Sequence, residues 1–266
     1  MLLRQGADKV NMAPKHASVG IAAKQGGCMG RVLSKSKLVA YRQCPKRLWL
    51  EVHRPDLRED SAQAQAKFKA GNQVGDIARR QYDPRNKGAL LDAQAEGFDA
   101  VFDRTKRLLD ANQPIFEAAF RTPEALAFAD VLLPVRKGGK RGWKMVEVKS
   151  ATTVKDYHRD DAAIQVFIAR FTGLPLVEAA VACIDSSWVY QGDGDYAGLL
   201  AETDVTVEAL SRGDEVKAWI ADAHRVVSSK KEPDLKMGRH CNDPVAGSSS
   251  AHCTNLCPAV AHPVSL

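Results

Sequence analysis

The sequence lacks several features that mark specialised classes of protein. No apolar run approaches the roughly 20 residues that a helix needs to cross a bilayer. The first residues contain no apolar core of the kind found in secretory signals. A glycine-rich phosphate-binding loop and a Ser-His-Asp arrangement are also missing. These absences exclude a membrane span and a secretory leader, and they predict a soluble, cytoplasmic protein.

Aromatic residues are scarce at 6%, so extended stacking on nucleic-acid bases is not expected. The 266 residues are otherwise of ordinary globular composition, with 45% hydrophobic and 26% charged residues, and suit one sizeable α/β domain. Residues 1–32 hold +4 of the net charge of +6, so basicity alone is weak support for DNA binding. We interpret residues 1–32 as a disordered basic tail, with an organelle transit peptide as the alternative.

The hydrophobic period predicts helices first and then strands. A helix capped by Ser34 or Ser36 is followed by a second that begins at Pro45. Further helices are expected over 62–82, 93–111, 159–173 and 206–229, and strands over 114–122, 125–135, 142–150 and 174–185, with a short edge piece at 189–192. In the helix over 62–82, Gly71 and Gly75 indicate close backbone approach. The order predicts a mixed sheet with helices packed around it.

The segment "WKMVEVKS" places an acid and a base two residues apart in an apolar strand. Glu147 and Lys149 lie on the same face of such a strand, while Val146 and Val148 lie on the other. Asp130 ends the preceding apolar segment and comes opposite them if the strands pair. Two carboxylates suit Mg²⁺ or Mn²⁺, and a neighbouring lysine suits phosphodiester hydrolysis. The alternative is a surface ion pair between Glu147 and Lys149.

Three motifs resemble those of the PD-(D/E)XK nuclease superfamily, in its RecB-like branch that includes the CRISPR-associated exonucleases. They are "AD" at 129–130, "VEVKS" at 146–150 and "DDAAIQVFIAR" at 160–170. The resemblance implies a restriction-endonuclease-like fold over residues 33–235, a mixed central sheet flanked by helices. It also implies that Asp130, Glu147 and the carbonyl of Val148 bind the metal, that Lys149 is the catalytic lysine, and that Gln165 supports the site.

Two acids have a less certain place in this pattern. Many relatives carry a metal-binding histidine on the helix before the sheet, and Asp76 in "GNQVGDIA" stands at the matching place. Asp76 is either another oxygen ligand of the metal or a helix-surface acid. Glu117, in the first strand, either lines the same pocket or is an edge-facing charge.

The implied activity is that of a metal-dependent DNA nuclease, an exonuclease that acts on DNA ends or single strands in repair, recombination or defence. The alternative is an inactive nuclease-fold module that binds nucleic acid or a partner domain. Candidate contacts to the DNA backbone are Arg136, Lys137, Lys140, Arg141 and Arg159, with a solvated hairpin turn as the alternative. A second basic patch is expected at Arg42, Lys46 and Arg47.

The six cysteines divide into three groups. Cys183 lies in an apolar strand and reads as a small buried hydrophobe, and Cys28 belongs to the tail. In a reducing compartment the others favour metal binding or free thiols over disulfides. They are Cys44 near the start of the domain and Cys241, Cys253 and Cys257 in the C-terminal segment 236–266.

These four cysteines resemble the iron-sulfur staple of RecB-like relatives, in which a [4Fe-4S] cluster ties the two ends of the domain together. The match departs at Gly247, where the relatives carry another cysteine. The alternatives are zinc bound with His240 or His252, or no metal. Nuclease-like regions of this kind stand at the N-terminus of longer bacterial proteins, which implies a further C-terminal domain or partner chain.

Overall fold

The computed structural model describes residues 31–58, 62–236, 238, 241 and 252–253. The expected tail 1–32 and segment 236–266 therefore lie mostly outside the described residues. The helices are α1 (Lys35–Gln43), α2 (Pro45–His53), η1 (Pro55–Leu57), α3 (Ala62–Tyr82), α4 (Ala93–Glu96), α5 (Phe98–Ala111), α6 (Asp156–Phe171), α7 (Thr206–Ser211) and α8 (Gly213–Ser228). The strands are β1 (Leu33–Ser34), β2 (Ala89–Leu90), β3 (Ile115–Arg121), β4 (Ala125–Lys137), β5 (Lys140–Lys149), β6 (Leu176–Ile184) and β7 (Leu200–Asp204).

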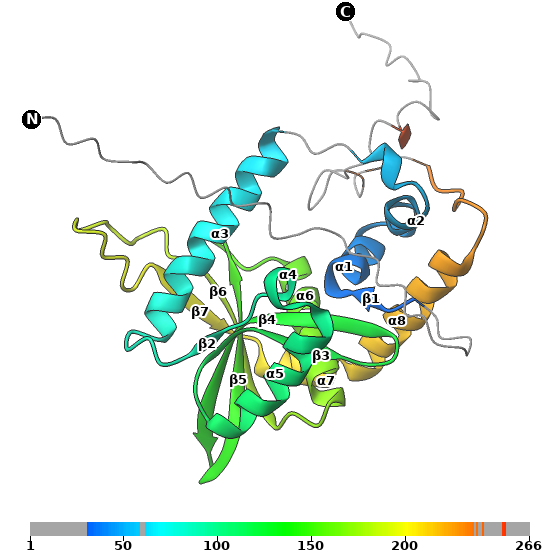
Figure 1. The fold of residues 1–266 in the computed structure, drawn as a ribbon. Helices are drawn as coiled ribbons and strands as arrows, with labels where there is room; N and C mark the ends of the chain where they lie inside the picture. The colour runs from blue at the N-terminus through cyan, green and yellow to red at the C-terminus, as the bar shows by residue number, and fades with distance from the viewer. Residues whose placement is uncertain (1–30, 59–61, 237, 239–240, 242–251, 254–266) are drawn as a thin grey trace, which may run out of the picture.

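Within this part of the chain the strands form one mixed, seven-stranded sheet. The order is β2-β3-β4-β5-β6-β7, and β1 pairs with β4. Strands β3, β4 and β5 form an antiparallel meander, and α6 then connects β5 to the parallel strand β6. The protein is thus α/β, with a mixed sheet flanked by helices, as the sequence predicts (Figure 1).

Strand β5 is buried on both faces. Val146 packs with Val74 and Ala78 of α3 on one face. Met145 belongs to the larger core that α6 joins on the other face. Because strand side chains alternate, Glu147 points to the α6 face, into the interior rather than to solvent.

Helices α1, α2 and α8 gather at one end of the molecule (Figure 1). The Trp49 indole of α2 donates to the Ser229 carbonyl at 2.9 Å, just past the end of α8. Leu33 pairs with Ala125 across β1 and β4, which fixes the start of α1 against the sheet. Lys35, the first residue of α1, is thereby held over the sheet.

Two helices expected from the hydrophobic period are each divided into two. The helix over 93–111 divides at Gly97, whose φ of +88° is open to glycine and strained for other residues. The helix over 206–229 divides at Arg212 into α7 and α8.

The edge strand expected at 189–192 is wrong, because β7 takes that role. The segment at 189–192 instead makes contacts with residues that follow it closely in the chain. The rings of Tyr190 and Tyr196 stack 5.2 Å apart, and the Tyr190 hydroxyl accepts a hydrogen bond from the Gly194 N–H. Local ring stacking here replaces strand pairing.

Two local expectations at helices are also wrong. Ser34 is the N-cap residue of α1, but its side chain makes no capping bond and instead contacts the Ser36 hydroxyl. Gly71 and Gly75 of α3 show no close approach, since a Cβ at either position would meet no described atom within 4 Å. Pro45, by contrast, starts α2 as predicted.

Of the helices in the described ranges, none has both the length and the apolar character needed to cross a membrane.

Candidate active site

Side chains from four elements meet above β5. The pairing of Val131 with Val146 brings Asp130 of β4 opposite Glu147. The Asp130 Oδ2 atom accepts a hydrogen bond from the Val148 N–H at 2.7 Å. The other members are Lys35 of α1, Lys149 of β5, and Asp161 and Gln165 of α6. The structure therefore brings together Asp130, Glu147, Lys149 and Gln165, the four residues that the sequence predicts as catalytic.

Glu147 is the centre of this group and is only 3% exposed. Its Oε1 atom accepts from Lys149 Nζ at 2.5 Å and from Lys35 Nζ at 3.0 Å. Its Oε2 atom accepts from the Gln165 amide, which is the supporting contact expected of Gln165. Burial and the nearby Asp130 raise the pKa of Glu147, but the two lysines outweigh them, so that the pKa lies below its ordinary value. Glu147 is ionised at neutral pH.

Lys35 and Asp161 are members of the site that the sequence did not predict. One Asp161 oxygen accepts from Lys149, and the other lies 3.2 Å from Lys35 Nζ. Asp161 stands one helical turn before Gln165 on α6, a spacing that places both on one face and was available as a signal. Lys35 is 112 residues from Glu147, and no local pattern links them.

Both lysines of the site are held in the charged state. Burial lowers the pKa of Lys149, but the carboxylates of Asp161 and Glu147 raise it well above its ordinary value. The same two carboxylates outweigh burial at Lys35 and raise its pKa. Lys149 is therefore an ammonium group at neutral pH in this arrangement, and acts as a cation rather than as a proton acceptor.

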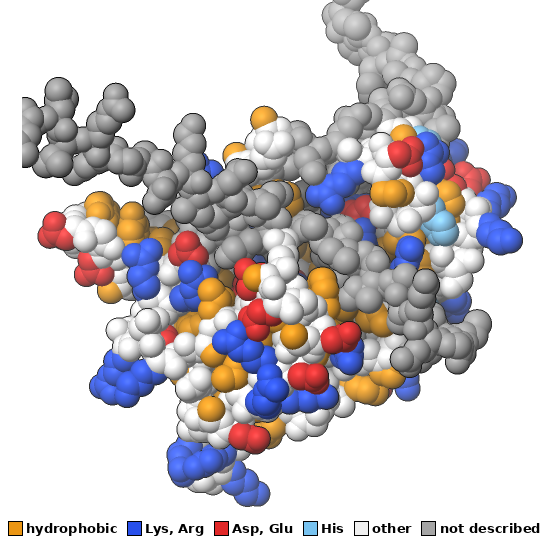
Figure 2. Space-filling view, viewed as in Figure 1, with side chains coloured by type: hydrophobic (Ala, Val, Ile, Leu, Met, Phe, Trp, Pro, Cys, Tyr) orange, Lys and Arg blue, Asp and Glu red, His pale blue; other side chains and the backbone are white. Residues whose placement is uncertain are grey.

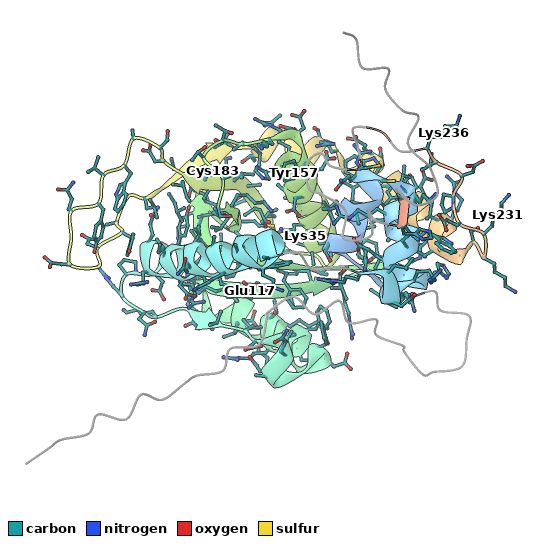
Figure 3. All side chains as sticks on the ribbon, turned by 90° about the horizontal axis from the view of Figure 1, so that it is seen from above. Lys35, Glu117, Tyr157, Cys183, Lys231 and Lys236 are labelled. Atoms are coloured by element: carbon teal, nitrogen blue, oxygen red, sulfur yellow. The ribbon has the colours of Figure 1, made fainter. Side chains whose placement is uncertain are left out.

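Asp130 differs from Glu147 in its electrostatics. Burial raises the pKa of Asp130 above the ordinary value; Lys35 opposes this shift, and Glu117 adds to it. The register places Glu117 opposite Asp130, with an exposed side chain and a left-handed backbone of φ +58°. Figure 3 shows Lys35 and Glu117 near one another in projection over the sheet, and both act on the charge of Asp130. Glu117 thus borders the site from its solvent side.

The donor set suits a hard divalent cation. Asp130 and Glu147 carry carboxylate oxygens, the ligands that such a cation prefers, and the Val148 N–H donates to Oδ2 of Asp130. The carboxylates of Glu147 and Asp161 form ion pairs with the two ammonium groups, and the Asp130 carboxyl group bonds to the Val148 N–H. Among the described residues, no three His, Cys, Asp or Glu side chains converge as a metal-binding group. Of the metal ligands predicted at this site, only Asp130 and Glu147 would bind through a side chain.

Asp76 is not joined to this group by any described contact. It forms an ion pair with Arg79 one turn along α3 at 2.7 Å, and its side chain is 46% exposed. Asp76 and Arg79 line a cavity of about 790 Å³ together with Arg80 and Tyr196. Of the two interpretations of Asp76, the structure favours the helix-surface acid.

The basic residues expected to contact DNA lie in different surroundings. In the register of the β4–β5 hairpin, Arg136 lies opposite Arg141 and Lys137 lies opposite Lys140. All four side chains are exposed. Figure 2 shows Lys and Arg side chains gathered at this tip of the molecule. Arg159 instead forms an ion pair with Glu208 at 2.6 Å.

The second expected patch is neutralised by acids. Arg42 pairs with Asp160, Lys46 with Glu232 and Arg47 with Glu51. These basic groups therefore serve contacts within the protein, and the hairpin is the better candidate for binding a nucleic-acid backbone.

Of the four predicted cluster cysteines, Cys44, Cys241 and Cys253 lie within the described residues, where no metal-binding group of three such side chains forms. Burial raises the pKa of Cys253; Lys46 opposes the shift, and the charges of Cys241 and Cys44 add to it. Cys257, Gly247 and His240 lie outside the described residues. His252 contacts Glu232 at 3.3 Å. Cys183 is buried, as predicted.

Comparison of the chain with protein-family models and with curated proteins finds no match. The resemblance to the PD-(D/E)XK nucleases therefore stays a prediction from the motifs. Any function rests on the geometry of the site itself.

His158, in the first turn of α6, provides a test of the electrostatics around Lys149. Its ring is 2% exposed, and its Nδ1 atom accepts from the Lys155 N–H at 3.2 Å. Burial, with the charge of Lys149 in addition, lowers the pKa of His158 from 6.5 to about 4. The unfolded chain therefore binds a proton first as the pH falls, and stability is lost between these two values, by about 3 kcal/mol in total.

We expect His158→Gln to remove most of this loss, because glutamine keeps an acceptor for the Lys155 N–H but does not titrate. Urea unfolding at pH 7 and pH 4 measures it. His224→Gln, in α8, is the same substitution at another histidine and serves as the control. A dependence equally steep in His158→Gln and wild type would show that His158 is not the group responsible.

Proposed function

We propose that this protein is a metal-dependent nuclease that hydrolyses phosphodiester bonds in DNA, with a restriction-endonuclease-like fold. The observation that carries the proposal is the meeting of Asp130, Glu147 and Lys149 on two central strands, with Gln165 fixing Glu147. A surface ion pair does not explain this arrangement, because Glu147 is almost fully buried.

Asp130, Glu147 and the carbonyl of Val148 would hold Mg²⁺ or Mn²⁺. Such an ion polarises a phosphate and lowers the pKa of bound water. Lys149 supplies a fixed positive charge next to Glu147, where it balances charge that develops on phosphate oxygens. Because Lys149 is held as an ammonium group, its role is electrostatic. Gln165 keeps the Glu147 carboxylate in one orientation.

The exposed hairpin with Arg136, Lys137, Lys140 and Arg141 would hold the DNA backbone. We infer a substrate with ends or single strands, and exonuclease action in repair, recombination or defence within the reducing cytoplasm.

A [4Fe-4S] cluster is the second part of the proposal. Cys44, Cys241 and Cys253 are far apart in the sequence, yet the charges of Cys44 and Cys241 act on the pKa of Cys253. Three thiolates with Cys257 would complete the four ligands that such a cluster takes. Bound there, the cluster would join the start of α2 to the C-terminal segment and restrain the unfolded chain.

The competing function is an inactive nuclease-fold module that binds nucleic acid or a partner. Two observations favour it: Asp76 is ion-paired with Arg79, and both oxygens of Glu147 already accept hydrogen bonds from the protein.

The deciding experiment is cleavage of labelled single- and double-stranded DNA by anaerobically purified protein with Mn²⁺ or Mg²⁺. We expect the wild type to cleave and Lys149→Ala to be about a hundredfold slower, as for the loss of one electrostatic group in an active site. Lys144→Ala is the matched control, because Lys144 lies on the same strand but pairs with the partly exposed Glu202. Equal rates for Lys149→Ala and wild type would place any activity elsewhere. No cleavage by folded wild type would favour the binding module.

A further inference from the structure

Lys35 reaches the site from outside the predicted motifs. Its ammonium group contacts the same Glu147 oxygen as Lys149, at 3.0 Å and 2.5 Å respectively, and also lies 3.2 Å from Asp161. The four side chains form a ring of alternating charge, Glu147–Lys35–Asp161–Lys149. The Lys35 side chain is 20% exposed and that of Lys149 is 19% exposed, whereas Glu147 is only 3% exposed.

The position of Lys35 has two electrostatic consequences. A cation that binds Glu147 must share the carboxylate with two ammonium groups, so Lys35 weakens cation binding. The charges of the four ring groups sum to zero, so the ring by itself offers a phosphate no net positive charge. A bound divalent cation makes the sum positive, and Lys35 then contributes to the charge that attracts the phosphate.

We propose that Lys35 is a second phosphate-binding cation of the active site, which competes with the divalent metal for Glu147 and becomes available to a substrate phosphate once the metal is bound. Asp161 positions Lys35 and Lys149 relative to one another. This role deepens the proposed nuclease function and rests on it for the identity of the substrate, a phosphodiester.

The test measures binding of two ligands to the full chain without requiring cleavage. Mn²⁺ affinity is measured by electron paramagnetic resonance in the absence of DNA. Affinity for a short fluorescent oligodeoxythymidine is measured by anisotropy with Ca²⁺ present. We expect Lys35→Met to bind Mn²⁺ about tenfold more tightly and the oligonucleotide about tenfold more weakly, each corresponding to about 1.4 kcal/mol.

The controls separate charge from folding. Lys37 lies two residues after Lys35 on α1 and forms an ion pair with Glu51 at 2.9 Å. The variant Lys37→Met should therefore change neither affinity. Lys35→Arg keeps the charge and should stay close to wild type in both. If Lys35→Met does not fold, Lys35→Gln, which keeps a donor for the two carboxylates, carries the same prediction.

The opposite direction of the two shifts is the signature, since a purely structural role would weaken both. An unchanged or weaker Mn²⁺ affinity, or an unchanged oligonucleotide affinity, overturns the proposal. If the wild type cleaves DNA while Lys35→Met shows no shifts, this role fails and the nuclease function stands. If the wild type does not cleave but the opposite shifts appear, the nuclease function fails and the binding role of Lys35 stands.

Discussion

Asp130→Asn is expected to slow DNA cleavage about a thousandfold, which corresponds to about 4 kcal/mol of transition-state stabilisation, without lowering the stability of the fold. Asparagine keeps an oxygen acceptor for the Val148 N–H, so the local hydrogen bond is conserved. It removes the negative charge that the proposed cation requires. The substitution should therefore lower the cleavage rate without lowering the free energy of unfolding.

The pKa of Asp130 gives the sign of the stability effect. Burial raises that pKa above its ordinary value of 3.8. The folded state therefore holds the proton more strongly than the unfolded chain, and ionisation costs stability as the pH rises from 3.8 through the folded pKa. At neutral pH the raised pKa of Asp130 is therefore a net cost to the fold, which Asp130→Asn removes.

Initial cleavage rates with Mn²⁺ and urea unfolding at pH 7 check this prediction. We expect an unfolding free energy equal to or above that of the wild type. A cleavage rate within tenfold of wild type would show that Asp130 is not a metal ligand. A clear loss of stability would show that its charge is favourable in the fold, contrary to the direction of its pKa.

Glu147→Ala is expected to lower the free energy of unfolding by about 3–5 kcal/mol, the cost of breaking a buried ion pair. Lys35, Lys149 and Gln165 all donate to this one carboxylate. Its removal leaves two ammonium groups with only Asp161 as a direct partner, and leaves a cavity in a buried layer. Such a loss is large compared with the 5–15 kcal/mol stability of a typical domain.

Urea unfolding of Glu147→Ala and of Asp99→Ala measures this difference. The Asp99–Arg121 pair is highly exposed, at 88% and 52%, so its loss should cost less than about 1 kcal/mol. Similar small losses for both variants would mean that the ring around Glu147 contributes no more than a surface ion pair.

Much of the candidate site was predictable because its parts are local. The period of two in β5 places Glu147 and Lys149 on one face, and the meander brings Asp130 opposite them. Helix α6, which follows β5 in the chain, then supplies Gln165. Each step depends on neighbouring elements, where backbone geometry leaves few alternatives.

Elsewhere the local pattern left two partners open for the same residue or segment. Asp76 was either a metal ligand or a helix-surface acid, and the structure shows it in an ion pair with Arg79, one turn away. The segment at 189–192 has the residues of a strand, yet its aromatic rings pack together while β7 completes the sheet. Local pattern does not reveal which of two available partners is nearer in space.

The sequence by itself determined the class of fold, the order of the elements and the acid-base pair on β5, because these follow from periodicity and from the fixed geometry of strands and helices. Only the tertiary structure decided that Lys35 and Asp161 complete the site. Those contacts join residues about a hundred or more positions apart, or depend on which faces of α1 and α6 turn inward. Their partners are selected by packing around the shared core, and packing is a property of the whole chain.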